Sequence, residues 1–190
     1  MTKIVGLDEA IKEGPFQVIY LDPPWSYREQ VQHGGKSAGY TSSAAAFYET
    51  IPIEDLCEAP IAKLADRNAV IFVWSTGPIL EDSLRAINAW GFKYKTIAFV
   101  WEKERVNPGA YTMSSCEYVL VATRGSIPKP RGARNVRQFL QSCRTRHSEK
   151  PEEIAKRIEA MFPTQKKIEL FARTTRSGWH CAGNEVSQAA

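Results

Sequence analysis

The sequence lacks the patterns that mark several large classes of protein. No uninterrupted apolar run approaches the roughly 20 residues that a membrane-spanning helix needs. Residues 1–14, MTKIVGLDEAIKEG, carry acids and have no apolar signal core, so we expect a cytoplasmic protein. The four cysteines, at positions 57, 116, 143 and 181, form no C-x-x-C pair. We therefore expect free thiols, and neither a zinc site nor a disulfide framework.

Two glycine-rich nucleotide motifs are also missing. No G-x-G-x-x-G follows an apolar run, so the usual fingerprint of nicotinamide and flavin enzymes is absent. The segment HGGKS at 33–37 resembles the end of a phosphate-binding loop, but the first glycine of that loop would fall on Gln30. We therefore exclude a nucleoside triphosphatase.

The sequence does contain enough apolar material for one core. With 190 residues, of which 43% are hydrophobic, it fits a single domain over 1–190. Its net charge of +4 is modest, but the segment 124–148 is rich in Arg and Lys and contains no acid. A solvated loop and a surface that binds a polyanion both account for such a run.

Apolar runs alternate with helical patterns along the chain. The runs are nearly continuous rather than alternating, which indicates strands covered on both faces. Strands that alternate with helices predict an α/β fold with a Rossmann-like, doubly wound, mostly parallel sheet. Stretches near 26–47, 102–117 and 124–148 have no such pattern, and we expect loops around a substrate there. The predicted strands cover 16–21, 69–74, 96–101, 118–123 and 167–172, and the clearest helices cover 77–91 and 151–162.

The stretch VIYLDPPWSY, at 18–27, ends an apolar run in an acid, two prolines and a tryptophan. Proline can neither donate to a sheet ladder nor continue it, so the strand stops and Asp22 lies at its carboxyl end. Ligands of open α/β sheets bind at that edge. The alternative is a strand-ending turn with a buried tryptophan behind it, since turns rich in Asp and Pro are common.

This combination suits a weakly nucleophilic amine on an aromatic ring, such as the amine of adenine. If a carboxylate and a carbonyl each accept one of its N–H bonds, the nitrogen moves toward tetrahedral geometry. Its lone pair then points at an electrophilic methyl group. Asp22 supplies the carboxylate, the Pro23-Pro24 turn fixes a main-chain carbonyl, and Trp25 offers a face for the base. No prior deprotonation is required, so the absence of a nearby His or Lys base does not count against this chemistry.

Four segments together resemble a known family. Asp22-Pro23-Pro24-Trp25, HSEKP at 147–151, IELFAR at 168–173 and SGWHCAGNE at 177–185 follow the order of the adenine methyltransferases named after the seventy-kilodalton subunit of messenger-RNA adenosine methyltransferase. The resemblance covers most of the chain from 16 to 185. It implies S-adenosylmethionine as methyl donor, and a sheet in which the catalytic segment precedes the donor-binding segment. The lack of added domains is similar to the compact bacterial or phage type, so we expect the cytoplasm of a bacterial or phage-infected cell.

The resemblance assigns roles residue by residue. Asp22, Pro23, Pro24 and Trp25 take the catalytic role. Lys150 matches a lysine that holds the donor's carboxylate, which agrees with an amine placed just before a helix that begins at a proline. The remaining positions implied to bind the donor, with Asn184 and Glu185 on its ribose hydroxyls, are Ser148, Glu169, Phe171, Arg173, Asn184 and Glu185.

The leading hypothesis is methylation of the 6-amino nitrogen of adenine in DNA, with the base extruded from a duplex or met in a single strand. The same chemistry on RNA, and a non-catalytic member that binds nucleic acid, remain alternatives. The resemblance also leaves a homodimer or a heterodimer open. The residues expected to track phosphates are Lys103, Arg105, Arg131, Arg134 and Arg137.

Overall fold

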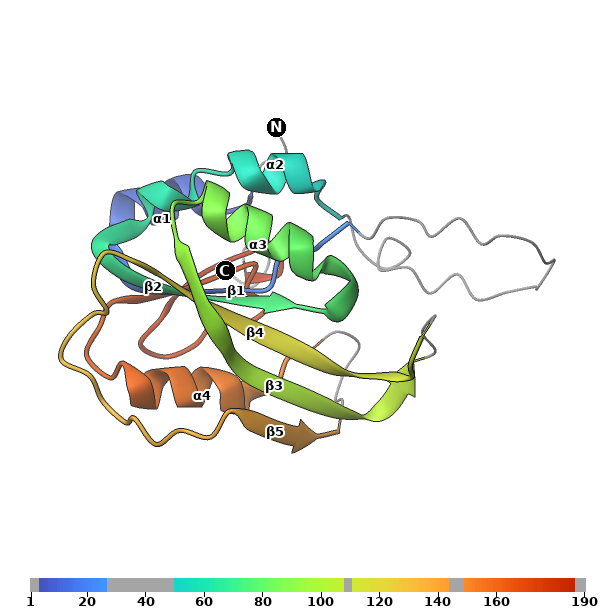
Figure 1. The fold of residues 1–190 in the computed structure, drawn as a ribbon. Helices are drawn as coiled ribbons and strands as arrows, with labels where there is room; N and C mark the ends of the chain where they lie inside the picture. Colours follow the sequence, from blue (N-terminus) through green and yellow to red (C-terminus); the bar gives the residue numbers. More distant parts are fainter. Residues whose placement is uncertain (1–3, 27–49, 108–110, 144–148, 187–190) are drawn as a thin grey trace.

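The computed structural model describes residues 4–26, 50–107, 111–143 and 149–186. Within these residues the strands form one seven-stranded sheet in the order β5-β3-β4-β2-β1-β6-β7 (Figure 1). No helix in this part of the chain is long and apolar enough to cross a membrane. The strands are β1 (Phe16–Leu21), β2 (Ala65–Ser75), β3 (Lys93–Asn107), β4 (Ser114–Arg124), β5 (Phe139–Ser142), β6 (Lys167–Leu170) and β7 (His180–Ala182).

The sheet is mixed and mostly parallel, as the sequence predicts. Every pair of neighbours is parallel except those of β4, which runs antiparallel to both β2 and β3. The antiparallel pairing of β3 with β4 follows from the short connection between them, since only residues 108–113 separate the two strands. A parallel crossover needs a dozen or more residues, so these two strands form a hairpin.

Helices cover both faces of the sheet (Figure 1). Pro60 ends the second helix, as its missing N–H requires, and a 3₁₀ turn at Ile61–Lys63 follows. A second 3₁₀ turn, Gly77–Ile79, leads directly into the third helix. α4 lies on the face opposite to the other helices. The helices are α1 (Leu7–Glu13), α2 (Ile53–Glu58), α3 (Leu80–Ala89) and α4 (Glu152–Met161).

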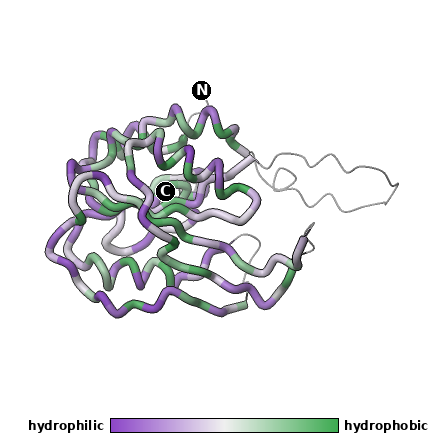
Figure 2. Tube along the Cα trace, in the orientation of Figure 1, coloured by the Kyte–Doolittle hydropathy of each residue, from purple (hydrophilic) through white to green (hydrophobic). Residues whose placement is uncertain are grey.

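The continuous apolar runs are explained by two cores, one on each face. Ile19 and Leu21 of β1 pack toward the face of α1, α2 and α3, whereas Val18 and Tyr20 pack toward α4. Because successive side chains of a strand point to opposite faces, a strand covered on both sides is apolar throughout. The hydrophobic segments accordingly concentrate along the central strands (Figure 2).

Two of the expected loops are partly strands. Most of 102–117 belongs to the β3–β4 hairpin, and 139–142 forms the edge strand β5. The prediction of loops there was wrong because neither segment contains an apolar run: 102–105 are all charged, and 139–142 has two apolar residues followed by two polar ones. The exposed and half-buried residues of β5 alternate along its length, as expected of a strand at the sheet edge. Most of the third expected loop, 26–47, lies outside the described residues.

Candidate active site

A pocket opens at the carboxyl edge of the sheet. Its walls are the segments 22–25 after β1, 74–76 at the end of β2, 171–173 after β6 and 184–185 after β7. The chain passes from β1 to β2 on one side, while β6 flanks β1 on the other. This is the switch point at which ligands of open α/β sheets bind, so the strand-end argument from the sequence finds Asp22 in the expected place.

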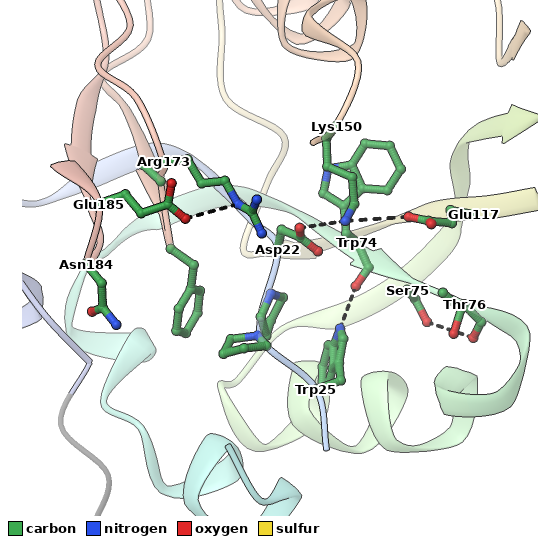
Figure 3. Close-up of a pocket in the computed structure, with 14 residues that line it drawn as sticks. Asp22, Trp25, Trp74, Ser75, Thr76, Glu117, Lys150, Arg173, Asn184 and Glu185 are labelled. Atoms are coloured by element: carbon green, nitrogen blue, oxygen red, sulfur yellow. Dashed lines mark hydrogen bonds and ion pairs between the residues drawn. The ribbon is translucent and has the colours of Figure 1, made fainter. Parts of the chain in front are cut away.

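Asp22 and Lys150 meet in this pocket although 128 positions separate them (Figure 3). Lys150 Nζ donates to Asp22 Oδ2 at 2.6 Å and lies 3.5 Å from Glu117 Oε2. Burial raises the pKa of Asp22, and the Lys150 ammonium opposes that shift. One ammonium is therefore shared by two carboxylates, and it favours the ionised form of Asp22, which can accept hydrogen bonds.

The Pro23-Pro24 turn is fixed by main-chain hydrogen bonds. The Pro23 carbonyl accepts the Trp25 N–H at 2.8 Å, and the Pro24 carbonyl accepts the Ile51 N–H at 2.9 Å. A carbonyl oxygen has two lone pairs, so each can accept a further N–H. The turn thus holds two main-chain acceptors beside Asp22 with little conformational freedom.

Trp25 lines the pocket but is mostly buried. Its side chain packs in the core with 5% of the residue exposed, and its indole N–H donates to the Trp74 carbonyl at 3.0 Å. Little of the ring is open to a stacked base, so the expectation of a free stacking face is not met in this arrangement. Trp25 instead anchors the Pro23-Pro24 turn to the end of β2.

Trp74 supports the same region from the next strand. Its indole N–H donates to the Tyr20 hydroxyl at 2.6 Å, and the Lys150 ammonium lies 5.3 Å from the centre of its ring. Burial raises the pKa of Tyr20, so the phenol stays protonated. Lys150 is therefore held by an aromatic face as well as by carboxylates.

The segment after β6 adopts an unusual conformation. Phe171 has φ 58°, a left-handed conformation that a bulky residue rarely adopts and that costs about 1–3 kcal/mol. Gly183 passes so close that a Cβ there would lie 2.2 Å from the Ala172 carbonyl oxygen. Strain of this kind persists where the surroundings enforce it. Here it brings Phe171, Arg173, Asn184 and Glu185 to one side of the pocket.

The polar residues on that side lie near its opening. Arg173 Nε is 3.5 Å from Glu185 Oε1, and both side chains are more than a third exposed (Figure 3). Asn184 is also exposed. Asn184 and Glu185 both line the pocket, and an amide and a carboxylate are suitable partners for ribose hydroxyls.

Glu169 does not line the pocket. It points to the α4 face of the sheet, beside Tyr20 on the neighbouring strand, and its carboxylate lies 3.1 Å from the Arg176 guanidinium. Arg176 also pairs with Glu152 in the first turn of α4. The assignment of Glu169 to the donor site is wrong for this structure, because alternation along β6 turns it away from the strand end. It instead ties the β6 side to the start of α4.

The four described side chains that were expected to contact phosphates divide into three groups. Lys103 is 4% exposed and its Nζ donates to Glu117 Oε1 at 2.9 Å, so it is an interior ion pair and not a phosphate contact. The Arg131 guanidinium lies over the ring of Phe162, which follows the last residue of α4. Lys150 precedes the other end of the same helix, so Arg131 is separated from the pocket by the length of α4. Arg134 and Arg137 are exposed, as expected. Ser148 and the side chain of Arg105 lie outside the described residues.

Sequence reasoning missed Glu117 and the 74–76 segment. Glu117 stands immediately before the apolar run at 118–123, at the start of a strand. Because β4 is antiparallel, its start lies at the same edge as the carboxyl ends of β1 and β2. An acid before a strand was the available signal, but it points to the pocket only if the strand direction is known.

Comparison with known proteins agrees with this geometry. The family model described as MT-A70 matches residues 16–185. Type II methyltransferase M.MunI from Mycoplasma sp is 43% identical over 97% of this chain and 85% of its own length. The putative N(6)-adenosine-methyltransferase MT-A70-like of Medicago truncatula is 28% identical over 92% of this chain, and the human N(6)-adenosine-methyltransferase catalytic subunit METTL3 is 25% identical over 91%.

The relatives differ in the share of their own length that this chain covers. The chain spans most of M.MunI, but only 27% of the Medicago protein and 28% of human METTL3. All the motifs that line the pocket fall inside the region that the family model matches. With that match over most of its length, the chain belongs to the MT-A70 family.

Proposed function

We propose that this chain is an S-adenosylmethionine-dependent methyltransferase that acts on the exocyclic 6-amino nitrogen of adenine in DNA. The observation that carries the proposal is the Asp22 carboxylate, held by Lys150 at a sheet switch point and followed by the rigid Pro23-Pro24 turn. The chain spans most of the length of M.MunI. That relative is named a Type II methyltransferase, and enzymes of this class act on DNA. A bacterial or phage-infected cell provides DNA in its cytoplasm, in agreement with the expected location.

The residues of the pocket fit the methyl donor. When bound, S-adenosylmethionine supplies an electrophilic methyl group on a sulfonium sulfur. Glu185 would accept hydrogen bonds from its ribose hydroxyls, and the amide of Asn184 would accept from them or donate to them. Phe171 would pack on its base, and Lys150 would meet its carboxylate. These assignments assume that residues 1–190 form one domain with the Rossmann-like methyltransferase fold.

The chain's own residues act on the amine. Asp22 and a main-chain carbonyl of the Pro23-Pro24 turn each accept one N–H, which orients the nitrogen lone pair outward and localises it. The oriented nitrogen would take the methyl group that the bound donor supplies, the donor being left as a neutral thioether. The proton that the nitrogen then loses would pass to solvent by way of the Asp22 carboxylate. Lys150 keeps Asp22 toward its ionised form throughout, because it offsets the effect of burial on the pKa of Asp22.

Methyl transfer from labelled donor to duplex DNA, single-stranded DNA and RNA, measured in parallel, tests the proposal. We expect N6-methyladenine in DNA, identified by nucleoside mass spectrometry, and formation at least about 10²-fold slower with Asp22→Ala. Product in RNA alone would replace the DNA proposal with the RNA alternative. Donor binding without any product on substrates of varied sequence would favour the non-catalytic alternative, and no donor binding would overturn the enzyme reading.

The basic segment is proposed to bind the DNA backbone through Arg134 and Arg137, which are exposed beside α4. We expect the logarithm of the DNA association constant to fall linearly with the logarithm of salt concentration. Replacing both arginines by Ala should reduce that slope by about 2, at roughly 0.9 per phosphate contact. Arg85→Ala is the matched control, because Arg85 is exposed on α3 and pairs with Glu54 at 3.3 Å. An unchanged slope in the double variant would exclude these two arginines as phosphate contacts.

A further inference from the structure

Charged side chains of alternating sign run from the pocket into the interior. Figure 3 shows the first three, Asp22, Lys150 and Glu117. Asp22 Oδ2 lies 2.6 Å from Lys150 Nζ, which lies 3.5 Å from Glu117 Oε2. Glu117 Oε1 in turn lies 2.9 Å from Lys103 Nζ. Side-chain exposure falls from 29% at Asp22 to 5% at Lys103. The chain of charges therefore begins at the catalytic carboxylate and ends at an ammonium that solvent hardly reaches.

Stability alone does not explain the inner pair. Desolvation of two buried ions offsets most of their attraction, so a buried salt bridge is weak evidence for stability. Lys103 and Glu117 lie on β3 and β4, neighbouring strands of the hairpin. Of these two residues only Glu117 reaches the pocket. The pair thus presents one carboxylate, from a rigid scaffold, to Lys150.

We propose that Glu117 and Lys103 are positioning residues that set how strongly Lys150 holds Asp22. Glu117 competes with Asp22 for the same ammonium, and Lys103 limits that competition because it satisfies the other oxygen of Glu117. Lys150 is then left more fully to Asp22. The catalytic meaning of this inference rests on the proposed function.

The electrostatics support this arrangement. Burial acts to raise the pKa of Glu117, but the ammoniums of Lys150 and Lys103 together hold it below its usual range. For Asp22, burial raises the pKa, Lys150 opposes it, and the charge of Glu117 raises it further. Removing either inner residue should therefore change the ionisation of Asp22, but in opposite directions.

Other charged and titratable groups that face Asp22 already have partners elsewhere. Arg173 pairs with Glu185, Glu169 pairs with Arg176, and the Tyr20 hydroxyl accepts the Trp74 indole N–H. Changes at Glu117 or Lys103 touch none of these contacts. The groups that act on Asp22, or are acted on by it, are Lys150, Glu117, Arg173, Glu169 and Tyr20.

Two variants test the proposal by the sign of a shift. Glu117→Gln removes the competing carboxylate, so Lys150 is left to Asp22 and the pKa of Asp22 should fall. Lys103→Met leaves Glu117 dependent on Lys150, so Asp22 loses part of its partner and its pKa should rise. The measurement is the carboxyl carbon NMR titration of the whole protein, with the Asp22 signal assigned by its loss in Asp22→Asn.

Glu54→Gln and Arg85→Met are matched controls, because they break an exposed ion pair of the same kind and should leave the titration of Asp22 unchanged. Shifts in the same direction in both test variants, or no shift in either, would overturn the proposal. If Lys103→Met does not fold, the Lys103→Met/Glu117→Gln double variant removes the buried charges together. The pKa of Asp22 should then be close to that in Glu117→Gln alone, because Lys103 acts on Asp22 through Glu117, and a value above that of the wild type would also overturn the proposal.

The pH dependence of activity is a second measurement, and it would not change if Glu117 and Lys103 had a purely structural role. The ionised form of Asp22 accepts the amine N–H, so a lower pKa extends activity to lower pH. The acidic limb of the kcat/KM profile should therefore move down in Glu117→Gln and up in Lys103→Met. The NMR titration needs no methyl transfer, so an inactive wild-type protein would defeat the proposed function and leave the positioning result to be judged separately.

Discussion

Asp22→Ala should lower kcat for methyl transfer by about 10²–10³, the usual effect of removing one preorganised hydrogen-bonding group in a transition state. The reason is that the amine then keeps its lone pair delocalised into the ring. Donor binding should not weaken, because the substitution frees Lys150 from its 2.6 Å contact with Asp22. Single-turnover methylation, together with a calorimetric titration of the donor, measures the two effects separately.

Asp22→Asn is the sharper companion to that variant. An amide oxygen still accepts one N–H, but it carries no charge and no longer attracts the Lys150 ammonium. We expect an intermediate rate, below wild type and above Asp22→Ala. Equal rates for the alanine variant and wild type would exclude Asp22 from the reaction. Equal rates for the two variants would mean that charge, and not the acceptor oxygen, is what Asp22 contributes.

Most of the strands could be predicted from the sequence. They are covered on both faces of the sheet, so each appears as a nearly continuous apolar run. The predicted strand at 16–21 coincides with β1, and the other apolar runs lie within or overlap β2, β3, β4 and β6. The unpredicted strands are β5 and β7, which lie at the two edges of the sheet. Edge strands have fewer buried neighbours, and β7 has only three residues, so neither produces an apolar run.

The sequence predicts a site residue where a polar side chain comes directly after the end of a strand. Asp22 was found because the prolines mark where β1 stops, and strand ends collect ligands in this class of fold. Glu117 was missed because its place depends on the direction of β4, which single-sequence periodicity does not encode. Glu169 was misassigned because proximity in sequence to a strand end does not say which face a side chain occupies.

Lys103 illustrates a further limit. In the sequence it belongs to a basic protein and follows an apolar run, so solvent and phosphate are its ordinary partners. Its partner Glu117 is 14 residues away, across a hairpin whose register is needed before the pair can be recognised. The count of charged residues therefore suggests a surface that could bind a polyanion, but it gives no sign of the interior ion pair.

Lys150→Met should weaken donor binding by about 10- to 100-fold, the range expected for a charge-assisted hydrogen bond of about 1.5–3 kcal/mol. Lys150 stands directly before Pro151 and α4, where an ammonium and the helix N-terminus can both meet an anion. The same substitution leaves Asp22 and Glu117 without the cation they share. Calorimetry with S-adenosylhomocysteine, a product that carries the same carboxylate, measures the loss without turnover.

The methyl ester of S-adenosylhomocysteine separates the carboxylate contact from a general disturbance of the pocket. Wild type should bind the ester less tightly than the acid, whereas Lys150→Met should bind the two about equally, because the interaction that distinguishes them is gone. Lys150→Arg retains the charge and should keep part of the preference for the acid. If Lys150→Met discriminates between acid and ester as well as wild type does, Lys150 serves Asp22 and Glu117 alone, and another residue must hold the donor's carboxylate. Arg173, which lines the same pocket beside Glu185, would then be the next cation to test.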